Sequence, residues 1–395
     1  MKEQLKQLFI HLQALIWRYE HKQQREPLVY FESFHGKQFS DNPRAIYEGL
    51  VANYPEVKVV WGVKKGYEAP FEAHHIPYVH RFSKEWYQAV GRASIWVTNT
   101  RTKTWIKKRP DTLYIETWHG TPLKRIGLDI EDVNIAGQST ADYHRSVREE
   151  TALWDYLISP SPYASQIFKS AFHLRQDQLL EVGYPRNDQL VNTTTMSQAN
   201  IKKQLGLDDD QRVILYAPTW RDNLVKEDHV YGFQFPFSLD RFLEQVDENT
   251  ILLIRMHYLV KEAFDLTAYH GRVRDVSDYE DMGQLLQIAD VLITDYSSSF
   301  FDYALLNRPM IFYMFDRQYY QEALRGTYFD VDDTLPGPIV ETEEALFQLL
   351  SNPQALTLDA SRMQAFQQRF NTYDKGRATD AVIDVIMKEI DGGQG

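Results

Sequence analysis

Short apolar runs alternate with helical segments along most of the chain, and this alternation restricts the possible folds more than any other feature. After Pro27, strand-like runs occur at 28–31, 57–63, 95–98, 113–115, 156–158 and 180–182. Helical segments separate most of these runs, and the clearest of them are 41–52, 83–91 and 161–172. Short apolar strands alternating with helices predict a mainly parallel, doubly wound sheet in an α/β protein.

The same alternation starts again after residues 192–210, which are polar and loosely patterned. A second series of strands is expected at 213–217, 251–255, 273–276, 291–294 and 310–313. Its helices are expected near 238–246, 281–288 and 299–306, and the tail at 341–390 shows a helical pattern without strands. Two Rossmann-like halves in 395 residues predict two domains that face each other across a cleft. We place these domains at 27–192 and 193–395.

Residues 1–26 do not follow the α/β pattern. Apolar side chains recur there at helical spacing, at Leu5, Leu8, Phe9, Leu12, Leu15, Ile16 and Tyr19. Basic side chains lie mostly off this stripe, at Lys2, Lys6, Arg18 and Lys22. Such an amphipathic helix can lie flat on an anionic membrane, or it can dock on the protein's own body. No run approaches the roughly 20 apolar residues that span a bilayer. We therefore expect a peripheral protein at the cytoplasmic face of the cell membrane.

Charge and cysteine content exclude several classes of function. The chain carries 43 Lys and Arg against 55 Asp and Glu, a net charge of −12, whereas nucleic-acid-binding proteins usually have a basic excess. It contains no cysteine, which excludes disulfides, thiolate metal sites and cysteine nucleophiles. We expect no nucleic-acid partner, and the chain could form a homo-oligomer. Walker, Gly-x-Ser-x-Gly and Gly-x-Gly-x-x-Gly motifs are also absent from the sequence.

His119 comes directly after a strand-like run, in the stretch Trp118-His119-Gly120-Thr121. Ligands of open α/β sheets bind beyond the carboxyl ends of the strands. A neutral imidazole there can accept a proton from an attacking hydroxyl, and Gly120 allows the backbone to approach a ligand closely. The alternative is an ordinary loop or packing histidine.

In the second half, polar side chains again follow the strands. Arg255 ends the run at 251–255 and His257 lies just past it. The two side chains could hold a phosphate, or they could be a solvated histidine and an arginine paired with an acidic neighbour. Thr219 and Arg221 follow the run at 213–217, where Pro218 alone could explain a turn.

A third group in this half follows the run at 291–294. Asp295 is followed by Ser297, Ser298 and Ser299 just before a helix, which favours an anion site, although an ordinary serine N-cap is the alternative.

Taken together, these residues belong to an ordered set of motifs. The set comprises Glu116–Arg125, Gly183–Asp188, Ala217–Asp222, Arg255–His257, Thr294–Ser299 and Arg325–Asp330, preceded by Tyr30–Gly36 and Asp41-Asn42-Pro43. In this order they resemble the CDP-glycerol glycerophosphotransferase family, the primases and polymerases of wall teichoic acid. The resemblance covers roughly residues 28–335.

The resemblance implies a GT-B arrangement, CDP-glycerol as donor, a lipid-linked saccharide or a short glycerol-phosphate chain as acceptor, and release of CMP. It also implies that His119 and His257 are the two important histidines, and we expect His119 to be the general base. The expected donor-binding residues are Gly120, Thr121, Thr219, Arg221, Arg255, Asp295, Ser297, Ser298 and Ser299. We expect no cofactor and no metal, because no carboxylates cluster in the sequence.

Three alternatives stay open at this point. The motifs do not distinguish CDP-glycerol from CDP-ribitol, and a nucleotide-sugar glycosyltransferase of the same architecture is a second rival. A membrane-bound scaffold with an inactive site is the third. The chain has almost no extension before the two domains, which favours an enzyme of the primase or short-extension type.

Overall fold

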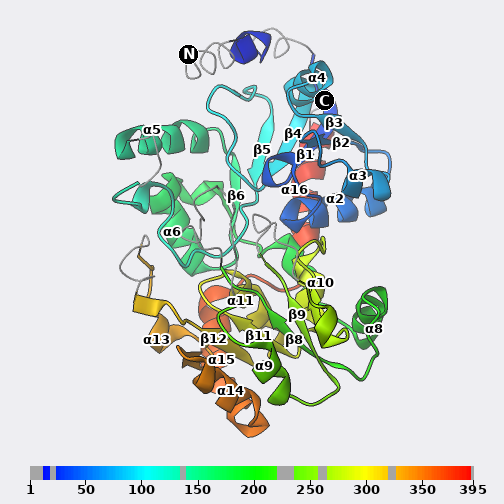
Figure 1. Ribbon diagram of the computed structural model, residues 1–395. Helices are drawn as coiled ribbons and strands as arrows, with labels where there is room; N and C mark the ends of the chain where they lie inside the picture. Colours follow the sequence, from blue (N-terminus) through cyan, green and yellow to red (C-terminus); the bar gives the residue numbers. More distant parts are fainter. Residues whose placement is uncertain are drawn as a thin grey trace, which may run out of the picture. The chain divides into compact units, whose positions relative to one another are not determined.

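The computed structural model describes residues 12–17, 24–133, 139–219, 235–256, 265–318 and 326–392. By their contacts, the residues form two units (Figure 1). The first contains the chain up to His119, Ile126–Asp188 and Thr372–Gly395, and the second contains Gly120–Arg125 and Gln189–Asn371. We call these units the first and the second domain.

The first domain is built on seven parallel strands in the order β3-β2-β1-β4-β5-β6-β7. The strands are β1 (Glu26–Glu32), β2 (Lys58–Val63), β3 (Tyr78–His80), β4 (Ala93–Thr98), β5 (Leu113–Glu116), β6 (Tyr156–Ile158) and β7 (Leu179–Leu180). The helices are α2 (Asp41–Asn53), α3 (Ala69–Ala73), α4 (Lys84–Arg92), α5 (Thr140–Thr151), α6 (Pro162–Phe172) and α16 (Ala378–Gly392). The strand order reverses between β1 and β4, which is the point where such sheets bind ligands.

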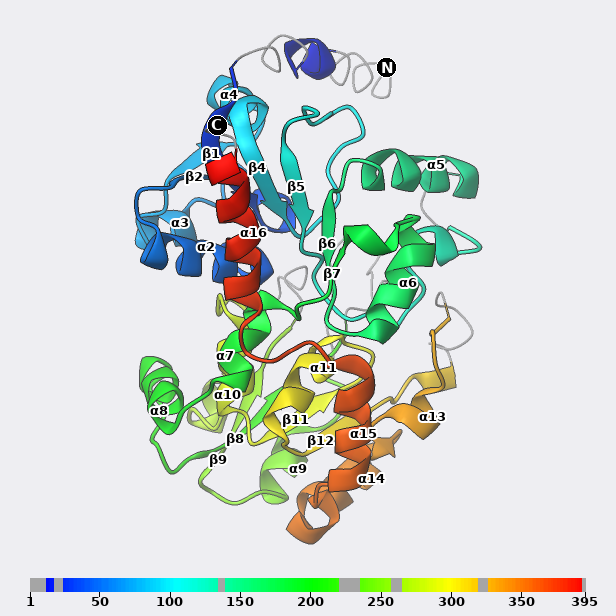
Figure 2. The ribbon, with the colours of Figure 1, turned by 180° about the vertical axis from the view of Figure 1, so that it is seen from behind.

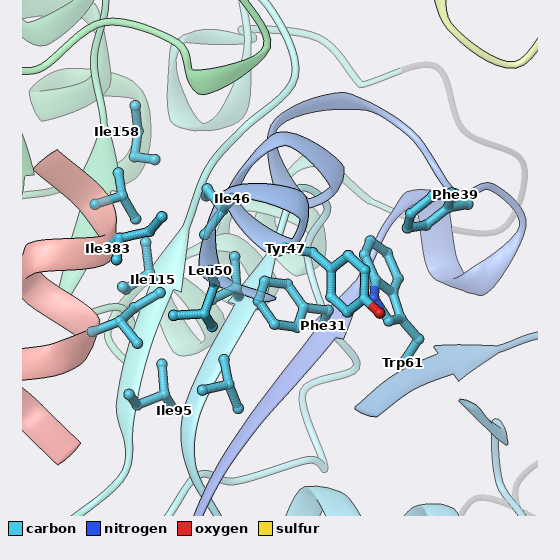
Figure 3. Packing of buried hydrophobic residues seen from close by; sticks show 14 of the residues in the cluster. Phe31, Phe39, Ile46, Tyr47, Leu50, Trp61, Ile95, Ile115, Ile158 and Ile383 are labelled. Carbon is cyan, nitrogen blue, oxygen red and sulfur yellow. The ribbon is translucent and has the colours of Figure 1, made fainter. Parts of the chain in front are cut away.

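The core of the first domain packs strand side chains against α2 and α16 (Figure 3). Phe31 of β1 and Trp61 of β2 stack with ring centroids 5.4 Å apart, and both are fully buried. Ile46 and Leu50 of α2 lie in the same cluster, as does Ile383 of α16. The last helix of the chain therefore completes the core of the first domain.

The second domain has six parallel strands in the order β10-β9-β8-β11-β12-β13. Figure 2 labels β9, β8, β11 and β12 of this sheet. The strands are β8 (Arg212–Tyr216), β9 (Thr250–Ile254), β10 (Val273–Asp275), β11 (Val291–Thr294), β12 (Met310–Tyr313) and β13 (Ile339–Val340). The helices include α8 (Thr195–Gln204), α9 (Leu239–Glu244), α10 (Met282–Ile288), α11 (Ser299–Tyr303), α13 (Val331–Thr334), α14 (Glu343–Leu350) and α15 (Ala360–Phe370). Here the order reverses between β8 and β11.

Two Rossmann-like domains are thus present, as the alternating pattern predicts, but their limits differ from the expected ones. The second unit begins at Gln189 rather than at 193, and Thr372–Gly395 belongs to the first unit. The reason is that Val382, Ile383 and Ile386 form a buried face of α16 that covers the first sheet. Residues 120–125 join the second unit, where Leu123 O accepts the Tyr328 N–H at 2.9 Å.

Some elements had no clear signal in the sequence. Strand β3 is only three residues long and none of them is fully buried. Helix α8 lies within the polar stretch 192–210, and Ile201 is its only buried residue. It begins at a capping box in which the Thr194 and Ser197 side chains bond each other's backbone N–H groups. Local hydrogen bonding, rather than an apolar stripe, marks this helix.

The described part of the expected N-terminal helix is helical at 12–17. Trp17 is buried, its Nε1 donates to Lys107 O at 3.0 Å, and its ring contacts those of Trp86 and Trp96. By contrast, three apolar side chains of the same segment are 44–49% exposed, namely Leu12, Leu15 and Ile16. The remainder of the expected helix at 1–26 lies outside the described residues. Within the described ranges, no helix is long and apolar enough to cross a membrane.

Candidate active site

The turn that carries His119 is held by hydrogen bonds on two sides. Strand β5 ends at Glu116, whose Oε1 accepts the backbone N–H of Trp118 at 3.0 Å. On the other side, the buried Asn42 amide donates to the carbonyl oxygens of Thr117 at 3.3 Å and Trp118 at 3.2 Å. Trp118 has a φ of 54°, an uncommon value for a bulky residue that persists only where the surroundings fix it. The conformation of this turn is therefore set by its neighbours.

The His119 imidazole has one nitrogen bound to the protein. Nδ1 lies 2.7 Å from the carbonyl oxygen of Asn99, and because a carbonyl only accepts, Nδ1 carries the proton. The neutral ring then presents Nε2 as a proton acceptor. Burial and the charge of Arg186 lower the pKa of His119, whereas the hydrogen bond to Asn99 and the Asp41 carboxylate oppose this shift. A neutral ring at pH 7 is suited to act as a general base.

The side chain of Asn99 ties three further groups together. Its Oδ1 accepts the Phe34 N–H at 2.8 Å, and its Nδ2 donates to Ser33 Oγ at 3.2 Å and to Asp41 Oδ2 at 2.8 Å. Asp41 in turn forms an ion pair with Arg186 at 2.7 Å. The loops after β1 and β4 and the start of α2 are therefore fixed to the residue that orients His119.

Glu116 acts through the turn rather than by reaching a substrate. Its side chain is fully buried, and burial raises its pKa well above the usual range. The Thr98 hydroxyl donates to its Oε2 at 2.7 Å and opposes that rise, while Glu150 adds to it. A buried carboxyl with both oxygens engaged gives the His119 turn a rigid support.

In the second domain, Asp295 connects the loops that follow β8 and β11. It is 1% exposed, and its Oδ1 accepts the N–H of Thr219 at 2.8 Å and the N–H of Tyr296 at 2.6 Å. The Thr294 hydroxyl donates to Ala217 O at 2.7 Å across the same two strands. The geometry shows Asp295 orienting this edge of the sheet, which lies at the reversal of strand order.

The three serines after Asp295 are partly exposed residues. Ser297 Oγ and Ser299 Oγ are 2.9 Å apart, and Ser298 precedes α11 without a side-chain capping bond. A Cβ added to Gly120 would lie 2.7 Å from Ser298 Oγ. Any larger residue at 120 would therefore require the Ser298 side chain to shift. The ordinary N-cap interpretation does not describe Ser298.

Arg255 is engaged with the backbone. Its Nη1 donates to Val276 O at 3.0 Å and also to Ser277 O, and the Met256 N–H donates to Ser277 Oγ at 2.9 Å. Burial lowers its pKa, and nearby aspartates, Asp278 first, oppose this shift. The guanidinium thus holds the turn after β10 against the end of β9.

The structure places the other expected site residues as follows. Thr121 is 2% exposed, and its hydroxyl has no hydrogen-bond partner among the described residues. His257 and Arg221 lie outside the described residues. In the described ranges, no three His, Asp or Glu side chains form a group that could hold a metal ion.

The sequence did not single out the side chains that hold His119. Asp41, Asn42 and Glu116 occur in the quoted motifs, but nothing in their local pattern assigns them a role. Asn99 directly follows the run at 95–98, so its position at a strand end was a usable signal.

Comparison with known proteins identifies the family. A model of the CDP-glycerol:poly(glycerophosphate) glycerophosphotransferase family matches residues 15–388. The teichoic acid glycerol-phosphate transferase of Staphylococcus aureus strain NCTC 8325 is 43% identical over 391 residues, covering 98% of this chain and 100% of that protein. The teichoic acid poly(glycerol phosphate) polymerase of Bacillus subtilis strain 168 is 44% identical and covers 91% of this chain, which spans 48% of that polymerase.

Solved structures of the wall teichoic acid polymerase TagF are similar to this chain along its length. One has a TM-score of 0.90 at 37% identity and covers 99% of this chain and 97% of its own. Another, a histidine variant soaked with CDPG, has a TM-score of 0.89 at 36% identity with the same coverage. The expected GT-B-like pair of Rossmann-like domains and the family resemblance are confirmed. The chain is a transferase that belongs to the CDP-glycerol:poly(glycerophosphate) glycerophosphotransferase family.

Proposed function

We propose that the protein transfers glycerol phosphate from CDP-glycerol to a hydroxyl of a lipid-linked acceptor, with His119 as the general base. The observation that carries this proposal is the fixed tautomer of His119, whose Nδ1 is held by Asn99 O at 2.7 Å. This leaves Nε2 unprotonated and able to accept a proton. Membership of the family supplies the donor class.

In the proposed reaction, the acceptor hydroxyl attacks the phosphorus that bears glycerol. The bond from this phosphorus to the oxygen of the CMP group breaks, CMP leaves, and His119 Nε2 takes the hydroxyl proton. Phosphoryl transfers of this kind depend on in-line positioning and on stabilisation of phosphate charge. No covalent protein intermediate is needed.

The donor-binding role goes to residues of the second domain. The hydroxyls of the partly exposed residues Ser297, Ser298 and Ser299 offer donors for phosphate oxygens. Thr219, Thr121 and Gly120 complete the proposed set, together with Arg221 and His257. Asp295 contributes by fixing the loops that carry Thr219 and the serines, and Arg255 holds the turn after β10 against the end of β9.

For the acceptor, we propose a lipid-linked saccharide that already carries glycerol phosphate, extended by a small number of units. The support is the relative matched along its whole length, which is named a glycerol-phosphate transferase. Similarity to a polymerase favours extension over priming of a bare saccharide.

The decisive experiment is mass analysis of products from CDP-glycerol and a short lipid-linked disaccharide, with and without one glycerol phosphate. The proposal expects CMP release and mass increases of whole glycerol-phosphate units. Parallel reactions with CDP-ribitol and with UDP-sugars test the two rival donors. Turnover of either rival in preference to CDP-glycerol would contradict the proposal.

We further propose that the N-terminal segment contacts an anionic membrane. Its support is that Leu12, Leu15 and Ile16 are exposed while the neighbouring Trp17 is buried in the first domain. The triple replacement of the exposed residues by serine should release the protein from anionic vesicles but leave activity on a soluble acceptor unchanged. Trp17→Ala should instead lower the stability of the first domain. Aggregation of the triple variant would show that these side chains belong to the core.

A further inference from the structure

Polar loops follow the carboxyl ends of β1 and β4, the central strands of the first sheet. The proposed reaction assigns these loops no contact with a substrate. Strands β1 and β4 run side by side with Glu32 paired to Thr98, and the strand order reverses between them. Ligands of open parallel sheets bind at this reversal. The loops that leave it are Ser33–Lys37 and Asn99–Lys103, which we call the switch-point loops.

The loop that follows β1 has an unusual backbone conformation, which neighbouring residues hold in place. Phe34, His35 and Gly36 have φ values of 46°, 59° and 75° in succession. The His35 carbonyl accepts from Arg81 Nη1 at 2.9 Å, and a Cβ on Gly36 would lie 2.6 Å from Gly62 O. Left-handed non-glycine residues cluster at functional sites, where the surroundings hold them in place.

The loop also lies next to His119. The rings of Phe34 and His119 have centroids 5.8 Å apart, and the Phe34 N–H and the His119 ring are both bound by Asn99. A ligand group bound by the switch-point loops would therefore be close to the proposed base.

Three of the arginines at this edge already have an acidic side chain beside them. Arg81 pairs with Glu32 at 2.9 Å and Arg186 with Asp41 at 2.7 Å. The third pairs with a buried glutamate of α5, with Arg101 Nε and Glu150 Oε2 3.6 Å apart.

Lys103 differs from these arginines. It is exposed, and its ammonium group has no ion pair or hydrogen bond in the part of the chain that the structure describes. In the same loop, the buried Thr100 Oγ1 and Arg101 Nη1 also have no hydrogen-bond partner among those residues. Unused donors in one loop favour an oxygen-rich ligand.

The electrostatic surroundings of His35 point the same way. Burial, followed by the charges of Arg81, Lys103 and Lys37, lowers the pKa of His35 to about 4. The ring is neutral at pH 7, so it can donate one hydrogen bond.

We propose that Lys103, Lys37 and His35 bind the phosphate of the acceptor's terminal glycerol-phosphate unit. The terminal glycerol would then present its free hydroxyl to His119 Nε2, one short polyol away from the bound phosphate. This inference rests on the proposed function, and it gives the first domain a reason to distinguish an acceptor that carries phosphate from a bare saccharide.

The same chemistry could come from two sources, the acceptor phosphodiester or the diphosphate of the donor. Binding is therefore measured on the full chain with each probe alone. One probe is a soluble oligomer of three glycerol-phosphate units without CDP-glycerol, and the other is CDP-glycerol without acceptor. The variants are Lys103→Ala, Lys103→Glu and Lys103→Arg. The matched control is Lys58→Ala, at an exposed lysine where β2 begins.

We expect Lys103→Ala to weaken binding of the oligomer roughly tenfold, as for loss of one charge-assisted contact. Lys103→Glu should weaken it further, and Lys103→Arg should largely restore it. Lys58→Ala should change nothing, and the affinity for CDP-glycerol should be the same in all variants. Added salt should weaken binding less in Lys103→Ala than in the wild type.

Two results would overturn the inference. One is unchanged oligomer binding in both Lys103→Ala and Lys103→Glu, and the other is a selective loss of CDP-glycerol binding. Because binding is measured without turnover, it also separates this inference from the proposed function. The protein could bind the oligomer in a Lys103-dependent way and yet transfer nothing from CDP-glycerol. That result would refute the proposed function but not this inference.

Discussion

The two domains reverse their strand order at equivalent points but place different chemistry there. In the first domain, loops after β4 and β5 carry Asn99 and His119, and the hydrogen bonds converge on one imidazole. In the second, the loop after β11 carries Asp295 and Ser297. The buried Asp295 carboxylate accepts hydrogen bonds from backbone N–H groups, whereas Ser297 is a partly exposed residue. The strand ends of the first domain orient a single proton acceptor, the His119 imidazole. Those of the second domain carry several hydroxyl groups that can donate hydrogen bonds.

The difference follows from what each group has to do. A general base works only if one nitrogen is unprotonated and points in one direction, so it needs a partner for the other nitrogen and a rigid turn. A phosphate is recognised by several N–H and O–H groups at once, so the protein has to leave those donors unused.

Replacement of His119 by alanine should remove the base and leave both domains folded. We expect turnover to fall by about 10² to 10⁴, the usual range for loss of a general base. CMP release from CDP-glycerol plus acceptor measures the effect, and circular dichroism checks the fold. His74→Ala, at an exposed histidine, is the control. Near-normal CMP release by His119→Ala would show that His119 is not the general base.

The variant Asn42→Ala should affect only the site of the first domain, at His119. It deletes two hydrogen bonds to the turn that precedes His119, so the ring loses its fixed direction. We expect kcat to fall about tenfold, with about 1–3 kcal/mol less free energy of unfolding, while the KM for CDP-glycerol stays the same. Steady-state kinetics and urea denaturation measure the two effects. An unchanged kcat would mean that the turn keeps its shape without Asn42.

The variant Ser298→Ala should have the opposite kinetic signature. This side chain makes no capping bond, so its loss should cost little stability. If the serines bind donor phosphate, the KM for CDP-glycerol should rise by roughly fivefold to tenfold, the equivalent of about 1 kcal/mol for one ordinary hydrogen bond. A lower kcat at unchanged KM would place Ser298 with the first edge instead.

The smallest expected effect concerns pH. The Asp41 carboxylate raises the pKa of His119, and the charge of its partner Arg186 lowers it. Asp41→Asn removes the carboxylate that raises this pKa and leaves the charge of Arg186 without its partner, so the pKa of His119 should fall further. A base is active in its neutral form, so the acidic limb of kcat/KM should move to lower pH. Profiles for the wild type and the variant measure the shift, and a move to higher pH would contradict His119 as the base.

The local sequence pattern was enough to find candidate site residues at the strand ends of both domains. His119 and Asp295 each follow an apolar run, and ligands bind beyond strand ends. What the pattern could not show was their partners. Asn99 holds His119 across 20 residues, and Asn42 clamps the same turn across more than 70. Side-chain hydrogen bonds of this reach leave no periodic trace in the sequence.

The same limit explains the domain boundary. The tail is visibly helical, and the spacing of Val382 and Ile386 shows which face is apolar. An apolar helical face does not identify the sheet that will cover it. Contacts with α2 and β4 assign α16 to the first domain although it ends the chain.

By itself, the sequence determined the α/β class, the two Rossmann-like halves, the strand ends where polar residues gather and, through its ordered motifs, the family. These features depend on periodicity and on neighbours along the chain. Only the tertiary structure decided which nitrogen of His119 is free, that Asp295 orients its loops through backbone N–H groups, and that the charge of Lys103 acts on His35. The physical reason is that orientation, burial and charge at a site are set by groups that folding brings together from distant segments.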